Sequence, residues 1–88
     1  MFTGIVEALA KVEKIEKEQG NIHVWLSCSF VNELKIDQSV SHNGICLTVV
    51  DIKNGNYKVT AIQETLDKTN LKHWKEGSFV NLERCMPA

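Results

Sequence analysis

Short segments of alternating apolar and polar residues, separated by glycine-containing turns, make up most of this 88-residue chain. The clearest of them follows Asn43-Gly44, a dipeptide that favours a tight hairpin because both residues accept positive φ at little cost. Residues 45–50 (ICLTVV) are rich in β-branched and apolar side chains, as strands are. Side chains alternate between the faces of a strand, so Cys46 and Thr48 share one face and the aliphatic residues the other. If the aliphatic face packs in the core, the face with Cys46 and Thr48 is free to line a site.

The same alternation predicts further strands at residues 22–28 (IHVWLSC), 39–42 (SVSH), 57–62 (YKVTAI) and 79–84 (FVNLER). The first segment, 5–15 (IVEALAKVEKI), alternates imperfectly, and its Ala, Leu, Glu and Lys residues favour a helix by propensity. A polar turn at 17–21 separates it from the next strand, which indicates a hairpin. This spacing favours a long, bent strand over a helix for the first segment.

The segments between these strands read as turns and single helical turns. Residues 30–34 are long enough only for one helical turn, and a second Asn-Gly turn lies within 51–56. Thr65 is a plausible N-cap for a brief helix over 66–71. About six short strands at regular spacing, with turn signals between them, predict a small antiparallel barrel in one domain over residues 1–88.

Composition narrows the function classes. The chain is 43% hydrophobic and carries ten basic and eleven acidic side chains, for a net charge near −1, which is typical of one small globular domain. A nucleic-acid binder needs a basic face, so this balance argues against that class. No apolar run approaches the length of a membrane-spanning helix, and the opening MFTG does not resemble a signal peptide. We therefore expect a cytoplasmic protein with no nucleic-acid or membrane partner.

Candidate chemical groups are few. The three cysteines form neither a CxxC pair nor a zinc-binding pattern with the histidines, so no metal site is expected. His42 lies across a turn from Cys46 and could activate its thiol, although a solvated strand-end histidine is the plainer interpretation. Glu64 is the single acidic residue in AIQETL and fits either a general base or a hydrogen-bond acceptor at a helix N-terminus.

Four sequence motifs together resemble a known family, and their combination is far more specific than any one of them alone. They are MFTGIVE at 1–7, NGICLTVV at 43–50, ETLDKTNL at 64–71 and GSFVNLER at 77–84. In this order and at this spacing they resemble the amino-terminal half of riboflavin synthase of the alpha-chain type, over essentially the whole of residues 1–84. The resemblance implies an all-β fold, a six-stranded antiparallel Greek-key barrel with short helical turns. It also implies that this barrel is the first of two similar barrels, and that the second is absent from these 88 residues.

The resemblance further implies an activity. Each barrel of the family enzyme binds one 6,7-dimethyl-8-ribityllumazine, and the enzyme, a four-carbon-unit transferase, converts two lumazines to riboflavin and a pyrimidinedione with no cofactor. The catalytic chamber lies between the first barrel of one subunit and the second barrel of a neighbour in a trimer. An isolated first barrel is expected to pair as a homodimer and to be inactive or very slow.

Site residues follow from the same motifs. No catalytic residue is assigned, although Cys46 and Ser39 are possible contributors to the pocket. Two departures from the family pattern are Ala10, where glycine is common, and Ser41-His42, where apolar residues are common. The positions that match the family's substrate-binding motifs are Gly4, Ile5, Val6, Cys46, Leu47, Thr48, Thr60, Ala61, Ile62, Gln63, Glu64 and Thr65.

Two other functions compete with this one. A non-catalytic lumazine- or flavin-binding protein of the same fold, such as the light-emission antenna proteins, is the main alternative. Such relatives tend to lose the CLTV and ETL motifs, and both are present here. A nucleic-acid-binding barrel is the other, and it lacks a basic face or an aromatic cluster.

Overall fold

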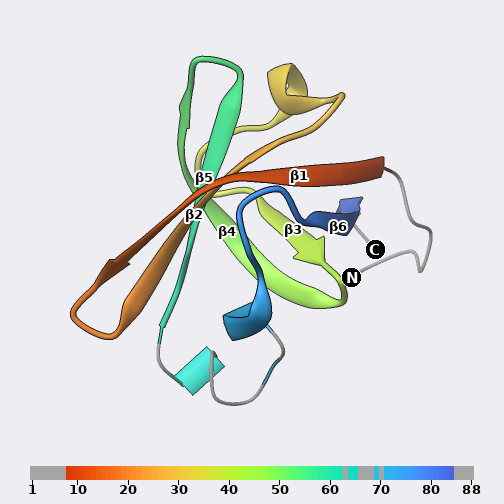
Figure 1. The fold of residues 1–88 in the computed structure, drawn as a ribbon. Coiled ribbons are helices and arrows are strands. Elements are labelled where there is room, and N and C mark those ends of the chain that lie inside the picture. Colours follow the sequence, from red (N-terminus) through yellow and green to blue (C-terminus); the bar gives the residue numbers. More distant parts are fainter. Residues whose placement is uncertain (1–7, 63, 66–68, 70, 85–88) are drawn as a thin grey trace.

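The computed structural model describes residues 8–62, 64–65, 69 and 71–84, and within them the chain forms a closed antiparallel barrel (Figure 1). Around the barrel the strands follow the order β1-β2-β5-β4-β3-β6. Because β2 neighbours β5 and β3 neighbours β6, the chain crosses between non-consecutive strands in a Greek-key arrangement. The all-β barrel predicted from the sequence is thereby confirmed. The strands are β1 (Ala8–Glu18), β2 (Asn21–Ser27), β3 (Ser39–His42), β4 (Ile45–Lys53), β5 (Asn56–Ala61) and β6 (Phe79–Arg84).

Three two-residue turns connect the hairpins, and each places both of its residues at positive φ, as the right-handed twist of the flanking strands requires. The turns are Gln19-Gly20 (49° and 86°), Asn43-Gly44 (52° and 85°) and Asn54-Gly55 (53° and 78°). The strands therefore run further than the sequence predicted. Residues predicted as turn at 17–21 and 51–56 belong mostly to strands, because only two residues are needed to reverse the chain.

Two β-bulges interrupt the alternation of the strands, one in β1 and one in β4. The register of β1 against β2 shifts between Val12 and Lys14, and that of β4 against β5 shifts between Val49 and Asp51. A bulge adds one residue to a strand, so the next inward-facing side chain comes three positions later instead of two. Val12 is thus followed into the interior by Ile15, which packs against the core.

Helical structure is confined to short segments outside the barrel wall. The 3₁₀ helix η1 (Val31–Glu33) lies within the helical turn predicted at 30–34, and a second one, η2 (Leu71–His73), precedes β6. Figure 1 shows η1 and η2 at opposite ends of the barrel. Thr65 is already helical rather than a cap, as is Glu64, and most of the predicted helix at 66–71 lies outside the described residues. No helix in the described part of the chain is long and apolar enough to span a membrane.

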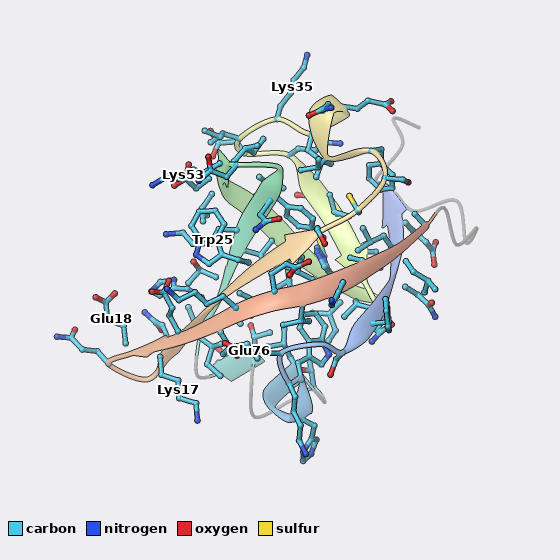
Figure 2. The ribbon with its side chains drawn as sticks, turned by 45° about the horizontal axis from the view of Figure 1, so that its top comes forward. Lys17, Glu18, Trp25, Lys35, Lys53 and Glu76 are labelled. Atoms are coloured by element: carbon cyan, nitrogen blue, oxygen red, sulfur yellow. The ribbon has the colours of Figure 1, made fainter. Side chains whose placement is uncertain are left out.

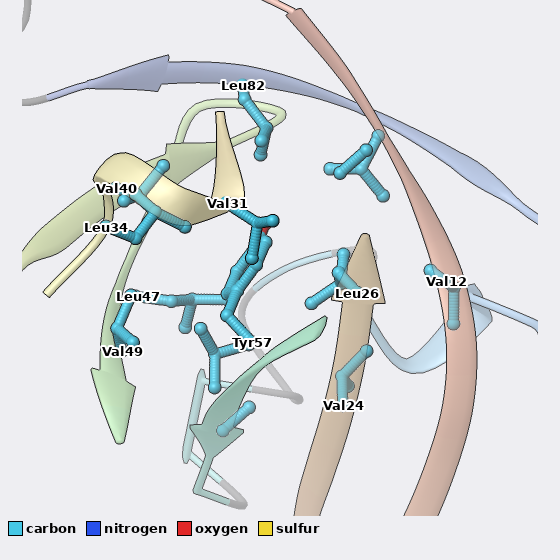
Figure 3. Packing of buried hydrophobic residues seen from close by; sticks show 14 of the residues in the cluster. Val12, Val24, Leu26, Val31, Leu34, Val40, Leu47, Val49, Tyr57 and Leu82 are labelled. Atoms are coloured by element: carbon cyan, nitrogen blue, oxygen red, sulfur yellow. The ribbon is translucent and has the colours of Figure 1, made fainter. Parts of the chain in front are cut away.

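The barrel interior is filled by aliphatic side chains around one tyrosine. Tyr57 is fully buried, and Leu26, Val31 and Leu47 lie around its ring (Figure 3). Leu47 and Val49 on β4 are likewise buried, so the aliphatic face of that strand does form the core. Cys46 and Thr48 are consequently left on the exterior.

The expectation that His42 is a solvated strand-end residue is wrong. Its side chain is fully buried in the barrel interior, where Nδ1 lies 2.9 Å from the carbonyl oxygen of Val40 and Nε2 lies 2.8 Å from Oη of Tyr57. A carbonyl oxygen only accepts, so Nδ1 carries the proton and Nε2 accepts from the Tyr57 hydroxyl. Burial lowers the pKa of His42 to about 4, against a smaller raising effect of the bond to Val40. The ring is therefore neutral near pH 7.

Candidate ligand-binding face

The exterior of β3 and β4 carries a compact group of small polar side chains. Ser39 on β3 lies directly opposite Thr48 on β4, and Ser41 lies opposite Cys46. Directly opposite residues of an antiparallel pair project to the same face, so these four side chains gather on the outer surface of the two strands. Three of them, Ser39, Cys46 and Thr48, were expected from the sequence to contribute to a site.

This polar face continues onto β5 and β2. Val49 and Val59 form an inward-facing pair between β4 and β5, and the adjoining residues Thr48 and Thr60 project outward beside it. On its other side Thr60 lies opposite His23 of β2, and their side chains are hydrogen-bonded at 2.8 Å. A row of polar side chains thus crosses four strands, from Ser39 through Thr48 and Thr60 to His23.

Other predicted site residues fall into three groups. Ile62 is 52% exposed and Glu64 is exposed, and both follow β5 directly where the polar row crosses it; Thr65 is partly buried. Leu47 and Ala61 are core residues, so only their backbone is available to an external ligand. The rest, Gly4, Ile5, Val6 and Gln63, lie outside the described residues.

Two residues of the polar face were not singled out from the sequence for this role. Ser41 projects outward, opposite Cys46 of β4 and Glu83 of β6, and is only 2% exposed. Its spacing of two from Ser39 was the signal that places both on one face. His23 offers no comparable signal, because the pairing of β2 with β5 joins strands that are not consecutive in the sequence.

The geometry excludes activation of the Cys46 thiol by His42. Cys46 is exposed on the outer face, whereas the His42 ring lies inside the barrel with both nitrogens hydrogen-bonded. The β4 wall therefore separates the two groups. Cys46 instead lies beside Ser41 on the outer face of the barrel.

Comparison with known proteins identifies the family. The model of the lumazine binding domain matches residues 3–85, nearly the whole chain. The chain belongs to the lumazine-binding domain family. Riboflavin synthase of Photobacterium phosphoreum is 38% identical over 88 residues, and that of Escherichia coli (strain K12) is 43% identical over 86. These matches cover 98% and 96% of this chain but 40% of each relative, so the chain spans about two fifths of their length.

Solved structures agree with this lumazine-binding domain in fold. LumP complexed with riboflavin matches with a TM-score of 0.88 and 26% identity, over 96% of this chain and 46% of that one. LumP complexed with 6,7-dimethyl-8-(1'-D-ribityl) lumazine matches with a TM-score of 0.89 and 25% identity, over 97% and 49%. Both neighbours were therefore solved with a ribityl-substituted heterocycle bound.

The lumazine-binding domain also has a groove of about 320 Å³ between the end of the β4–β5 hairpin and the outer face of β1 and β2, and none of the predicted site residues lines it. Trp25 lines this groove, and its indole Nε1 donates a hydrogen bond to Oε1 of Glu16 at 3.3 Å. The ammonium of Lys58 lies 5.4 Å from the centroid of the indole ring. The bond from Trp25 and the nearby Lys14 ammonium lower the pKa of Glu16. Figure 2 shows Trp25 and Lys53 on the same side of the barrel. The groove is lined by Lys14, Glu16, Trp25, Lys53, Asn54 and Asn56.

The described residues contain no group of three or more His, Cys, Asp or Glu side chains that could hold a metal ion. The candidate face offers hydroxyls, one thiol and one imidazole, which suit hydrogen bonding to an organic ligand.

Proposed function

We propose that the outer face of β3, β4 and β5 binds 6,7-dimethyl-8-ribityllumazine and riboflavin, as one barrel of a riboflavin synthase. The observation that carries the proposal is the row of hydroxyls from Ser39, Thr48 and Thr60 beside Cys46. A ribityl chain presents several hydroxyls, and a pteridinedione edge presents carbonyl oxygens and an N–H. Such a ligand needs several small donors and acceptors on one surface, and this face supplies them.

The relatives support the enzyme assignment over simple binding. Riboflavin synthases of 35–44% identity match across the chain, and the CLTV and ETL motifs are both present. In the proposed reaction one lumazine transfers a four-carbon unit to a second, giving riboflavin and a pyrimidinedione without a metal or organic cofactor. The protein contributes by positioning the substrates: it holds one lumazine so that the reacting carbons of that molecule meet those of the second lumazine.

The second lumazine needs a second barrel, which we propose lies in a longer protein of which this chain is the first barrel. Leu9 on β1 and Phe79 on β6 are 58% and 65% exposed, and both project from the outer face of the β1–β6 pair. The two side chains are diagonal neighbours on this face, and contiguous exposed apolar patches mark association surfaces. We propose that the isolated domain pairs as a homodimer, and that the full-length enzyme is a cytoplasmic trimer.

Binding is tested by the anisotropy of riboflavin and lumazine fluorescence during titration with the domain. We expect saturable binding of one ligand per barrel. Thr48→Arg places a long charged side chain on the face without touching the core and should abolish binding. Ser29→Arg, at an exposed position between β2 and η1, is the matched control and should bind normally. Equal binding by the two variants would place the ligand elsewhere.

Turnover is tested separately, by incubating the purified domain with lumazine and following the absorbance of riboflavin. We expect slow formation or none, because the acid–base groups of the second barrel are absent. A rate close to that of a full-length riboflavin synthase would overturn the proposed division of labour. Sedimentation at high concentration tests the homodimer, which a strictly monomeric profile would exclude.

A further inference from the structure

The Thr60 side chain carries one of the hydroxyls proposed to contact the ligand. It is hydrogen-bonded to a histidine that lies outside the four sequence motifs named above. His23 on β2 lies directly opposite Thr60, with 2.8 Å between Nδ1 of the ring and Oγ1 of the hydroxyl. The other ring nitrogen, Nε2, lies 3.2 Å from Oε1 of Glu18 near the end of β1. A chain of hydrogen bonds therefore runs from a carboxylate through an imidazole to a site hydroxyl.

The carboxylate decides which nitrogen of the neutral ring carries the proton. An ionised carboxylate only accepts hydrogen bonds, so Nε2 of His23 must donate to Glu18. In the neutral ring Nδ1 is then an acceptor, and the Thr60 hydroxyl must donate to it. The Thr60 hydroxyl therefore donates its proton to His23, and the lone pairs of the hydroxyl oxygen are available to accept a hydrogen bond on the outer face.

We infer that His23 is a positioning residue for ligand binding, which holds the Thr60 hydroxyl as a hydrogen-bond acceptor toward an N–H or O–H of the ribityllumazine. This inference rests on the proposed function. Without His23 the hydroxyl would rotate freely and present donor or acceptor with no preference. The side chain of His23 is only 20% exposed, which limits competition from water, whereas that of Glu18 is 71% exposed at the end of β1, beside the β1–β2 turn (Figure 2).

Protonation of the ring reverses this arrangement. A charged imidazole donates from both nitrogens, so Nδ1 would donate to Thr60 and release the threonine proton toward the ligand. Among the described residues of the neighbouring strands, the charged groups beside the ring are Glu16 and Glu18 of β1 and Lys58 of β5. Glu16 lies directly opposite His23, and Lys58 lies opposite the position two residues further along β2. The carboxylate of Glu16 is already bound by Trp25 and Lys14, which leaves Glu18 as the partner of the ring.

The proton positions are measured directly by long-range nitrogen–proton NMR of the histidine rings in the ligand-free domain. At a pH where the rings are neutral, we expect the proton of His23 on Nε2. His42 should show the opposite tautomer, with its proton on Nδ1, and serves as an internal comparison. A His23 ring with its proton on Nδ1 would overturn the inference, because Thr60 would then have to accept.

The consequence for binding is measured with a double-mutant cycle and riboflavin anisotropy. His23→Phe should weaken binding about 2- to 10-fold, and Thr60→Val about 5-fold or more. In the Thr60→Val background, His23→Phe should have no further effect, because the histidine acts through the hydroxyl. His23→Asn, whose carbonyl oxygen can accept from Thr60, should restore most of the affinity. His73→Phe, at an exposed histidine on η2, is the control and should leave it unchanged.

The affinity of the wild-type domain should also fall when its own NMR signals show that His23 becomes protonated, and His23→Phe should remove that dependence. Additive losses in the cycle, or failure of His23→Asn to restore binding, would overturn the inference while leaving the proposed function intact. Absence of riboflavin and lumazine binding by the wild-type domain would overturn both.

Discussion

Two histidines of this small barrel each bond to a hydroxyl on β5, one on either side of the wall. Inside, His42 accepts from Tyr57 and donates to a backbone carbonyl, and every group involved is enclosed by the core. Outside, His23 accepts from Thr60 and donates to the exposed Glu18. The inner pair is locked because no water can replace a lost partner, whereas the outer pair can change its proton positions. Equivalent hydrogen bonds therefore stabilise the fold on one side of β5 and, as we propose, orient a ligand contact on the other.

The largest expected effect is the acid sensitivity of the inner histidine. The pKa of His42 is lowered to about 4, and an unfolded histidine titrates near pH 6.5. Between these values the unfolded chain takes up a proton that the folded chain refuses, so stability present above pH 6.5 is lost as the pH falls to 4. The loss amounts to about 3 kcal/mol. Urea unfolding of the wild-type and His42→Gln domains at several pH values in this range measures the loss. The free energy of unfolding should fall more steeply with decreasing pH in the wild type than in the variant. If the variant does not fold, NMR titration of the wild-type ring serves instead, and titration near pH 6.5 would contradict the prediction.

Removal of the inner hydroxyl should have the next largest effect. Tyr57→Phe keeps the ring that fills the barrel but leaves the acceptor Nε2 of His42 without a donor in the core. We expect a loss of about 1–3 kcal/mol in the free energy of unfolding. The outer-face counterpart on the same strand, Thr60→Val, should change that free energy by less than about 0.5 kcal/mol. Equal losses for the two variants would show that the wall does not separate the two environments.

On the outer face, hydroxyl removal should affect the ligand instead of the fold. Thr48→Val keeps the shape of the side chain and removes one hydrogen-bonding group, so riboflavin should bind roughly fivefold more weakly, or about 1 kcal/mol. Thr48→Ser retains the hydroxyl and should bind as the wild type does. An unchanged affinity of the valine variant would exclude Thr48 as a direct hydrogen-bonding contact.

The smallest effect is expected at Cys46. Its thiol is exposed beside Ser41 and is separated from His42 by the strand that carries it, so His42 cannot act as the base that a nucleophilic cysteine needs. Cys46→Ser should change riboflavin affinity less than about twofold, and the corresponding variant of a two-barrel enzyme should keep measurable turnover. Loss of all turnover with binding intact would show that the thiol takes part in the reaction.

Local signals in the sequence predicted the turns and the composition of the outer face. Asn43-Gly44 and Asn54-Gly55 specify their hairpins because few other dipeptides adopt two positive φ values. Strand alternation after the first of these turns grouped Cys46 and Thr48 on one face, and the structure shows that this face is the exterior.

Features that depend on non-local pairing were not predictable in the same way. The Ala, Leu, Glu and Lys residues of the first segment allowed a helix by propensity, and the bulge in β1 also shortened its run of regular alternation. The buried His42 ring depends on a hydrogen bond from Tyr57, which lies fifteen residues away on β5, with β4 between the two strands. The His23–Thr60 contact needs the register of β2 against β5, which join only once the barrel closes.

Closure of the barrel also determines the order in which the chain can fold. β6 pairs on one side with β1 and on the other with β3, so it joins the beginning of the described chain to its middle. Until residues 79–84 have been synthesised and docked, β1 and β3 each present an open edge of unpaired backbone groups. Such long-range pairing slows folding and prolongs the exposure of those edges. A nascent chain that stalls before β6 would therefore be the species most prone to aggregation, and the one most in need of a chaperone.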